Sequence, residues 1–342
     1  MIRSFAMAVT KARRLKDRQH SKKACSRLTW ITLWCKHPKQ ENSYRLAMSL
    51  LVQADELATL LRSSTPPVVF DATALLPGES GNPAERFAQD HIPHSLYFDI
   101  DVFSDPQGQF PHTVPSAARY AGLMGAWGIT RADPIIFYDQ GNTASACRAW
   151  WLARAFGHAN ARILDGGLPA WRAAEQPTTG AATPPRPAAV YHAHTHYSRI
   201  TGLGDMSAIV ATGNRPILDA RSEARFYGTA PEPRPGVRSG HMPGAQCLPY
   251  KTVLDGQGRF LPPTALLALF QTLGIHPHDR PVTTCGSGMT ASVLTAALCL
   301  AGIDDNSLYD GSWAEWGSMP DLPVTTERPP TSNATAETEH DR

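Results

Sequence analysis

Residues 68–72 read Val-Val-Phe-Asp-Ala, an apolar run that ends in an acidic residue, and the pattern returns at residues 217–220 as Ile-Leu-Asp-Ala. Three further features recur in the same order at offsets of 145 to 150 residues, and the pairs are His91-Ile92-Pro93 with His241-Met242-Pro243, residues 135–139 with 281–285, and residues 164–167 with 309–312. Four features in one order at nearly one offset indicate an internal duplication. The sequence therefore predicts two copies of one structural unit.

Each copy alternates short apolar strands with helical stretches, such as residues 146–156 and 291–301. This alternation is typical of a parallel sheet that is covered by helices. We therefore predict an α/β fold of two tandem domains, each a mainly parallel sheet with helices on both faces.

Composition marks the boundaries of the two domains. The expected segments are a basic leader at 1–47, a first domain at 48–175, a linker rich in Pro, Thr and Ala at 176–199, a second domain at 200–323 and a disordered polar tail at 324–342. Met48 opens the first foldable stretch, so the leader is either disordered or the product of a start codon placed too early.

Charge is distributed unevenly along the chain. The net charge is +2, but residues 1–47 hold twelve of the 32 basic and two of the 30 acidic residues, which leaves residues 48–342 at −8. No nucleic-acid partner is expected, because the leader carries no recognisable binding motif. No membrane association is expected either, because no apolar run approaches the ~20 residues that a spanning helix needs. A cytoplasmic protein is predicted, or a mitochondrial one if the leader is a genuine targeting peptide.

The six cysteines form no Cys-x-x-Cys pair and no metal-ligand spacing with histidine, so neither a metal nor a cofactor is predicted. Cys285 differs from the others because it follows a short strand and precedes the apolar helix 291–298, which places it at the edge where α/β proteins bind ligands. Gly286 and Gly288 allow the backbone N–H groups of this loop to converge on the sulfur and to stabilise a thiolate. We predict that Cys285 is the nucleophile.

The other cysteines of the duplicated region, Cys147, Cys247 and Cys299, lack this setting and are interpreted as packing residues. The first copy carries Asp139 where the second carries Cys285. An aspartate cannot perform thiol chemistry, so we expect one catalytic domain and one supporting domain.

The loop Cys285-Gly286-Ser287-Gly288-Met289-Thr290-Ala291 resembles the active-site signature of the rhodanese superfamily, and within it the tandem-domain 3-mercaptopyruvate sulfurtransferases, over about residues 50–322. Gly and Ser after the cysteine are the mercaptopyruvate form, whereas thiosulfate-preferring members carry Arg-Lys. The resemblance implies a transferase that takes sulfur from 3-mercaptopyruvate, a small 2-oxo thiol. The sulfur would pass through a Cys285 persulfide to cyanide or to a thiol acceptor such as thioredoxin, with release of pyruvate.

The resemblance also implies the substrate-binding groups. Gly286, Gly288, Met289 and Thr290 belong to the loop that receives the substrate, and Arg225 and Arg234 match the arginines that bind its carboxylate and carbonyl. Arginine suits a planar partner with two oxygens. Arg221 is a weaker candidate for the same role.

A proton relay of Asp101, His112 and Ser287 is implied by the same resemblance. In such a relay the carboxylate orients the imidazole and the imidazole polarises the hydroxyl. The first copy would thus lend residues to the second. His94 departs from the pattern, because the second copy has Gly244 at the matching position in the turn. His91 and His241 are expected to be structural, and Asp165 and Asp310 are expected to be turn or cap residues.

Two alternatives remain open at this point. Thiosulfate:cyanide sulfurtransfer is disfavoured because no basic pair follows Cys285. A non-catalytic rhodanese-like binding module would be expected to lose the nucleophile, which the second copy retains.

Overall fold

The computed structural model describes residues 50–328, so the predicted leader and the end of the predicted tail lie outside the described residues. The first domain contains a five-stranded sheet in the order β1-β5-β4-β2-β3, with every neighbouring pair parallel. Its strands are β1 (Leu51–Val52), β2 (Val68–Asp71), β3 (Leu96–Tyr97), β4 (Ile135–Tyr138) and β5 (Ala161–Leu164).

The second domain repeats this topology in the order β6-β10-β9-β7-β8, again with parallel neighbours. Its strands are β6 (Ile200–Thr201), β7 (Ile217–Asp219), β8 (Ala245–Cys247), β9 (Val282–Thr284) and β10 (Ser307–Tyr309). The predicted duplication and α/β fold are confirmed, because the two sheets have the same strand order when each is counted along its own half of the chain.

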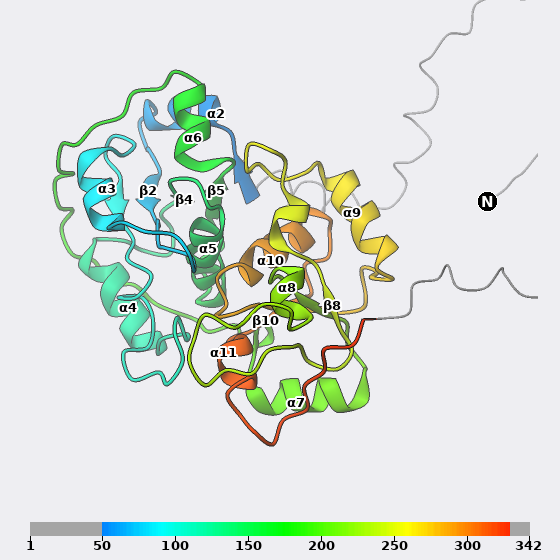
Figure 1. Ribbon diagram of the computed structural model, residues 1–342. Helices are drawn as coiled ribbons and strands as arrows, with labels where there is room; N and C mark the ends of the chain where they lie inside the picture. The colour runs from blue at the N-terminus through cyan, green and yellow to red at the C-terminus, as the bar shows by residue number, and fades with distance from the viewer. Residues whose placement is uncertain (1–49, 329–342) are drawn as a thin grey trace, which may run out of the picture. The chain divides into compact units, whose positions relative to one another are not determined.

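Helices connect the strands of each domain (Figure 1). Those of the first domain are α2 (Ala54–Leu61), α3 (Pro83–Gln89), α4 (Ala117–Ala126), α5 (Ala144–Ala155) and α6 (Gly167–Ala173). Those of the second are α7 (Leu203–Thr212), α8 (Glu223–Phe226), α9 (Pro263–Thr272), α10 (Ala291–Leu300) and α11 (Ser312–Trp316).

Helices α5 and α10 follow the two equivalent loops and pack against each other between the domains. Every residue of α10 is buried, as is every residue of α5 except Arg154. A helix that is apolar around its whole circumference is stable when it is buried on all sides. The pair therefore forms part of the largest hydrophobic cluster, which spans both domains.

The segment after α6 lies along the first domain up to residue 196 (Figure 1). Ala189 donates its N–H to the Gly125 carbonyl at 2.9 Å, His194 donates to the Phe156 carbonyl at 3.0 Å, and Tyr191 is buried. Because of these contacts the segment is docked on the first domain rather than spanning freely between the two.

His91 and His241 occupy equivalent structural positions, as predicted. Each exchanges two backbone hydrogen bonds with a threonine, Thr179 for His91 and Thr325 for His241. Each ring also stacks on a phenylalanine of its own domain and contacts that phenylalanine's carbonyl through Nδ1. Through the pairing at Thr325, the second domain extends past residue 323, where we expected it to end.

The turn after His91 accepts a side chain where the second domain has glycine. His94 has a φ of 67° and Gly244 has a φ of 78°. The left-handed conformation is therefore kept in both copies, at a strain cost for the histidine.

Candidate active site

The Cys285 loop joins the end of β9 to the start of α10, as the sequence predicts. The carbonyls of Cys285 and Gly286 accept hydrogen bonds from the N–H groups of Trp313 and Ala314 in α11, at 2.8 and 3.0 Å. Among the described residues, the N–H groups of residues 286–291 donate to no acceptor. Together with the N-terminus of α10 they form a site suited to an anion on Cys285, whose side chain is buried.

The equivalent loop of the first domain shows what such a site binds. The carboxylate of Asp139 accepts hydrogen bonds from the N–H groups of Gly141, Thr143 and Ala146, each at 3.0 Å. Burial raises the pKa of Asp139, and these N–H groups oppose that effect. The first domain thus fills its own anion site with a side chain of the chain itself, so it cannot offer that site to a sulfur intermediate.

The two glycines of the Cys285 loop are required for different reasons. Gly288 has a φ of 78°, and a Cβ at this position would lie 2.7 Å from Nη1 of Arg148. Gly286 has no positive φ, but a Cβ there would lie 3.0 Å from Nη2 of Arg225 and 3.7 Å from Nη1 of Arg234. The structure therefore brings both predicted substrate arginines to the cysteine loop.

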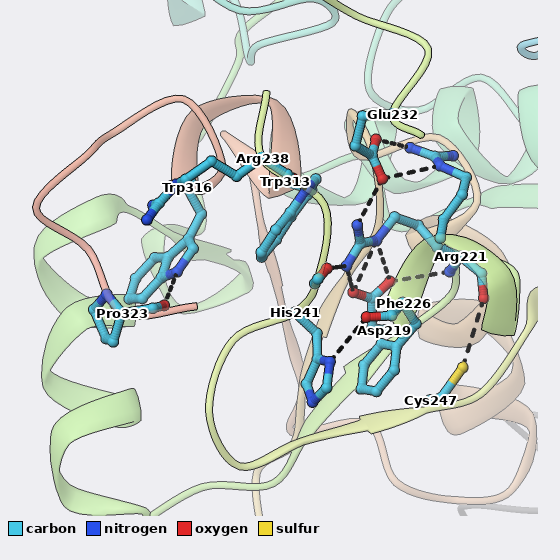
Figure 2. A network of polar contacts seen from close by, with 12 residues as sticks. Asp219, Arg221, Phe226, Glu232, Arg238, His241, Cys247, Trp313, Trp316 and Pro323 are labelled. Carbon is cyan, nitrogen blue, oxygen red and sulfur yellow. Dashed lines mark hydrogen bonds and ion pairs between the residues drawn. The ribbon is translucent and has the colours of Figure 1, made fainter. Parts of the chain in front are cut away.

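Arg221, the weaker candidate for substrate binding, is fully buried. Figure 2 shows the polar contacts around it. Arg221 donates to both oxygens of Asp219 and to Glu232, and its guanidinium lies 4.3 Å from the centre of the Trp313 ring. Every nitrogen of the guanidinium is paired with groups of its own domain, so Arg221 holds Asp219 and Glu232 in place instead of binding substrate.

Arg225 and Arg234 differ in their partners. Arg225 lies on α8 and donates through Nε and Nη2 to the two oxygens of Glu232. Arg234 makes no ion pair with any residue of the described part of the chain, and burial and the neighbouring charge of Arg225 lower its pKa, while Cys285 opposes the shift. An unpaired, half-buried arginine beside a cysteine loop is well placed to bind a substrate carboxylate.

The predicted relay is assembled across the two domains. Nδ1 of His112 lies 3.0 Å from the hydroxyl of Ser287, and Nε2 lies 3.5 Å from a carboxylate oxygen of Asp101. Burial, with a further contribution from Arg148, lowers the pKa of His112 to about 4. A neutral ring protonated on Nε2 accepts the Ser287 hydroxyl at Nδ1 and faces Asp101 with its N–H. The side chain of Asp101 is 86% exposed, so this last contact is weak.

Three further residues of the site were not predicted from the sequence: Glu232, Arg148 and Asp310. Glu232 had a signal, because it stands between two prolines and between two arginines. Arg148 had one as well, since it interrupts an apolar helix. Asp165 and Asp310 do lie in a turn and a bend, as predicted, but neither side chain caps the helix that follows, and their contacts with the other domain were not predicted.

Both aspartates accept backbone hydrogen bonds from the other domain. Phe260 donates to Asp165 at 3.0 Å, and Val114 donates to Asp310 at 2.8 Å. The two contacts are equivalent under the duplication, and an interdomain role of this kind leaves no trace in one copy alone.

Comparison with known proteins agrees with this arrangement. The Rhodanese-like domain family matches residues 53–174 and again residues 203–319. The chain is 38% identical over 278 residues to thiosulfate/3-mercaptopyruvate sulfurtransferase 1, mitochondrial, of Arabidopsis thaliana, covering 75% of this chain and 73% of the relative. It is 36% identical over 258 residues to the 3-mercaptopyruvate sulfurtransferase of Escherichia coli K12, covering 75% of this chain and 91% of the relative.

Solved structures show the same similarity. The crystal structure of SseA from Escherichia coli superposes with a TM-score of 0.70 at 31% identity and covers 78% of this chain and 99% of SseA. Tum1 from Saccharomyces cerevisiae gives a TM-score of 0.75 at 29% identity, with 82% and 99% covered. No helix within residues 50–328 is long and apolar enough to cross a membrane.

Proposed function

The chain belongs to the rhodanese family, and on that premise we propose that it is a sulfurtransferase that takes sulfur from 3-mercaptopyruvate, carries it as a persulfide on Cys285 and passes it to a thiol or to cyanide, releasing pyruvate. The observation that carries this proposal is the position of Gly286. Its missing side chain lets Arg225 approach the loop of the nucleophile, against which Arg234 also lies.

Binding comes first in the proposed mechanism. Arg234, which has no ion-pair partner in the described part of the chain, binds the carboxylate of mercaptopyruvate. Arg225, fixed through two of its nitrogens by Glu232, directs its remaining Nη1 toward the substrate carbonyl. These two contacts position the substrate sulfur next to the sulfur of Cys285.

The Cys285 thiolate then attacks the substrate sulfur. A new S–S bond forms, the C–S bond of mercaptopyruvate breaks, and its electron pair enters the carbonyl system to give the enolate of pyruvate. The N–H groups of the loop stabilise the negative charge on sulfur. Ser287, with His112 behind its hydroxyl, is the group suited to pass the proton that converts the enolate to pyruvate.

Transfer to the acceptor completes the cycle. A thiolate or cyanide attacks the outer sulfur, the S–S bond of the persulfide breaks, and the Cys285 thiolate is regenerated. Thioredoxin is a suitable class of acceptor because it supplies an accessible thiolate.

Thiosulfate is the second candidate donor, because the Arabidopsis relative carries both donors in its name. The two arginines beside Gly286 could attract this dianion. The loop itself carries no basic side chain, since residues 286–290 are Gly-Ser-Gly-Met-Thr. We therefore expect thiosulfate to be the poorer donor.

A direct comparison tests the proposal. Purified protein is supplied with 3-mercaptopyruvate or thiosulfate, plus either a thiol acceptor or cyanide, and the pyruvate, sulfide and thiocyanate formed are measured. Mass spectrometry of the protein treated with mercaptopyruvate alone should show one added sulfur on the peptide with Cys285, and Cys285→Ser should abolish both turnover and label. Sulfur on Cys247 or Cys299 instead, or turnover by Cys285→Ser, would contradict the assignment.

We further propose that the enzyme acts in the cytoplasm. The four cysteines in the described part of the chain are free, as is usual in a reducing compartment. A fluorescent reporter fused to residues 1–47 tests the alternative, since import into mitochondria would show that the leader is a targeting peptide.

A further inference from the structure

Arg148 is a fully buried arginine on α5 of the first domain, and it reaches the catalytic loop of the second. Its Nη2 donates to the His112 carbonyl and, at 3.1 Å, to Asp310, and its guanidinium lies 4.5 Å from the centre of the Trp151 ring. Its Nε and Nη1 are buried and have no partner among the described residues. A buried charge costs free energy unless it is well paired, so its presence requires an explanation.

The duplication provides an internal control for this position. At the offset of 146 residues that relates Asp139 to Cys285, Arg148 corresponds to Leu294 on α10. Leu294 is fully buried in the same core, so this position of the fold accepts an apolar side chain. The arginine is therefore present for the site that it faces, which is the site with the cysteine.

The loop that Arg148 binds also differs between the two halves. His112, whose carbonyl accepts from Arg148, has a φ of 63°, in the left-handed region that a histidine rarely adopts. At the equivalent site of the first domain, which carries Asp139 in place of the cysteine, the carbonyl of Gly258 accepts a hydrogen bond from the hydroxyl of Thr143 at 3.0 Å. A glycine needs no help to adopt such a conformation, whereas His112 has its carbonyl fixed by a buried charge.

We propose, on the basis of the proposed sulfurtransferase function, that Arg148 is a positioning residue for sulfur transfer: by binding the His112 carbonyl and Asp310 it holds the His112 ring against Ser287. Nη1 of Arg148 lies against Gly288, so the same side chain also packs against the cysteine loop. Arg148 thus joins the His112 loop, the Cys285 loop and β10's following residue, Asp310, at one point.

The charge of Arg148 adds a measurable signature. The groups that face His112 are the hydroxyl of Ser287 and the charged side chains of Arg148, Arg234, Asp310 and Asp101. Burial is the main cause of the low pKa of His112, and Arg148 is the next. Loss of Arg148 should therefore raise this pKa from about 4 toward, but not to, the ordinary value of 6.5.

Three variants test the proposal. Arg148→Leu introduces the residue found at this position in the other half. Arg148→Lys keeps the charge without the planar guanidinium. Arg154→Leu is the control, because it removes the other arginine of α5, which pairs with Asp304. We expect Arg148→Leu to lower kcat for mercaptopyruvate by roughly ten- to a hundredfold with little change in KM, because Arg225 and Arg234 remain. The acid limb of kcat against pH should move to higher pH. Arg148→Lys should recover part of kcat and keep the limb in place, and Arg154→Leu should leave both unchanged.

Titration of the His112 ring by NMR, in wild type and in Arg148→Leu, gives a readout that needs no substrate. An unchanged kcat and an unmoved limb in a folded Arg148→Leu would overturn the proposal, as would equal effects of Arg148→Leu and Arg154→Leu. If Arg148→Leu does not fold, Arg148→Lys decides, because full activity in it would show that the fork geometry is irrelevant. Failure of wild type to turn over mercaptopyruvate would refute the proposed function instead, while the titration would still report on Arg148.

Discussion

Gly286 lies directly against Arg225, since a Cβ at position 286 would be only 3.0 Å from Nη2 of that arginine. Few real Cβ contacts are this close, so a side chain at 286 requires the guanidinium to shift by a few tenths of an ångström. The residue at position 286 therefore affects where the guanidinium of Arg225 can lie. We expect the choice of sulfur donor to depend on this pair.

Replacement of Gly286 by Ala should raise the KM for mercaptopyruvate, because Arg225 must move away from its position. The double change Gly286→Arg with Ser287→Lys should shift the donor preference toward thiosulfate, since it adds two cations and removes the Ser287 hydroxyl. Steady-state kinetics with both donors measures this. Gly256→Ala is the matched control, because this glycine also has no positive φ and has open space around its Cβ.

Arg234→Ala should lower kcat/KM for mercaptopyruvate by roughly ten- to a hundredfold, because a charge-assisted hydrogen bond is worth about 1.5–3 kcal/mol. The loss should lie mostly in KM. Arg186→Ala is the matched control, since Arg186 pairs with Asp133 at the surface of the first domain. Equal loss for thiosulfate and mercaptopyruvate would mean that Arg234 does not recognise the 2-oxo acid.

The two ends of the relay should not contribute equally. Ser287→Ala removes the hydroxyl beside His112 and should lower kcat by roughly a hundredfold. Asp101→Asn should cost at most about fivefold, because exposed ion pairs contribute up to about 1 kcal/mol. Both are measured as kcat at neutral pH. If Asp101→Asn proves as damaging as Ser287→Ala, Asp101 must close over His112 during turnover.

Stability should depend on pH through His112. Its pKa is about 4 in the folded protein and near 6.5 when unfolded, so the unfolded chain binds more protons between these values. Stability from this group is complete above pH 6.5 and is lost as the pH falls to about 4, by about 3 kcal/mol at 1.4 kcal/mol per unit. His112→Asn should flatten this part of the profile, and asparagine tolerates the left-handed backbone. Urea unfolding at several pH values measures the difference between wild type and variant, which cancels the parallel effects of His158, His196 and His241, whose pKa values burial also lowers. Identical slopes would show that His112 is not buried as described.

The sequence was sufficient for features that repeat or that are local. The four paired features predicted the duplicated sheet, and the residues on either side of Cys285 predicted the loop between a strand and a helix that carries it. The resemblance named Arg225 and Arg234 as substrate-binding groups, which stays a prediction, and it did not indicate that Glu232 pairs with Arg225 and leaves Arg234 without an ion pair in the described part of the chain.

Features that depend on contact between the domains were beyond this reasoning. Arg148 lies 137 residues before Cys285 in the chain, and its role is visible only when α5 packs against α10. Asp165 and Asp310 look like ordinary turn residues in each copy, since their partners belong to the other copy. The relay could be named from the resemblance, but the exposure of Asp101 follows from the packing of its loop.

The paired contacts of Asp165 with Phe260 and of Asp310 with Val114 have the form of an isologous interface, in which each partner offers the other the same patch of surface. The chain is in this respect a homodimer whose subunits have been joined, and whose two potential sites have diverged into one. The remaining site draws residues from both halves, since His112 of the first contacts Ser287 of the second. The two halves, expressed as separate polypeptides, should be inactive alone and regain sulfur transfer when mixed, because complementation restores the partner on which the remaining site depends.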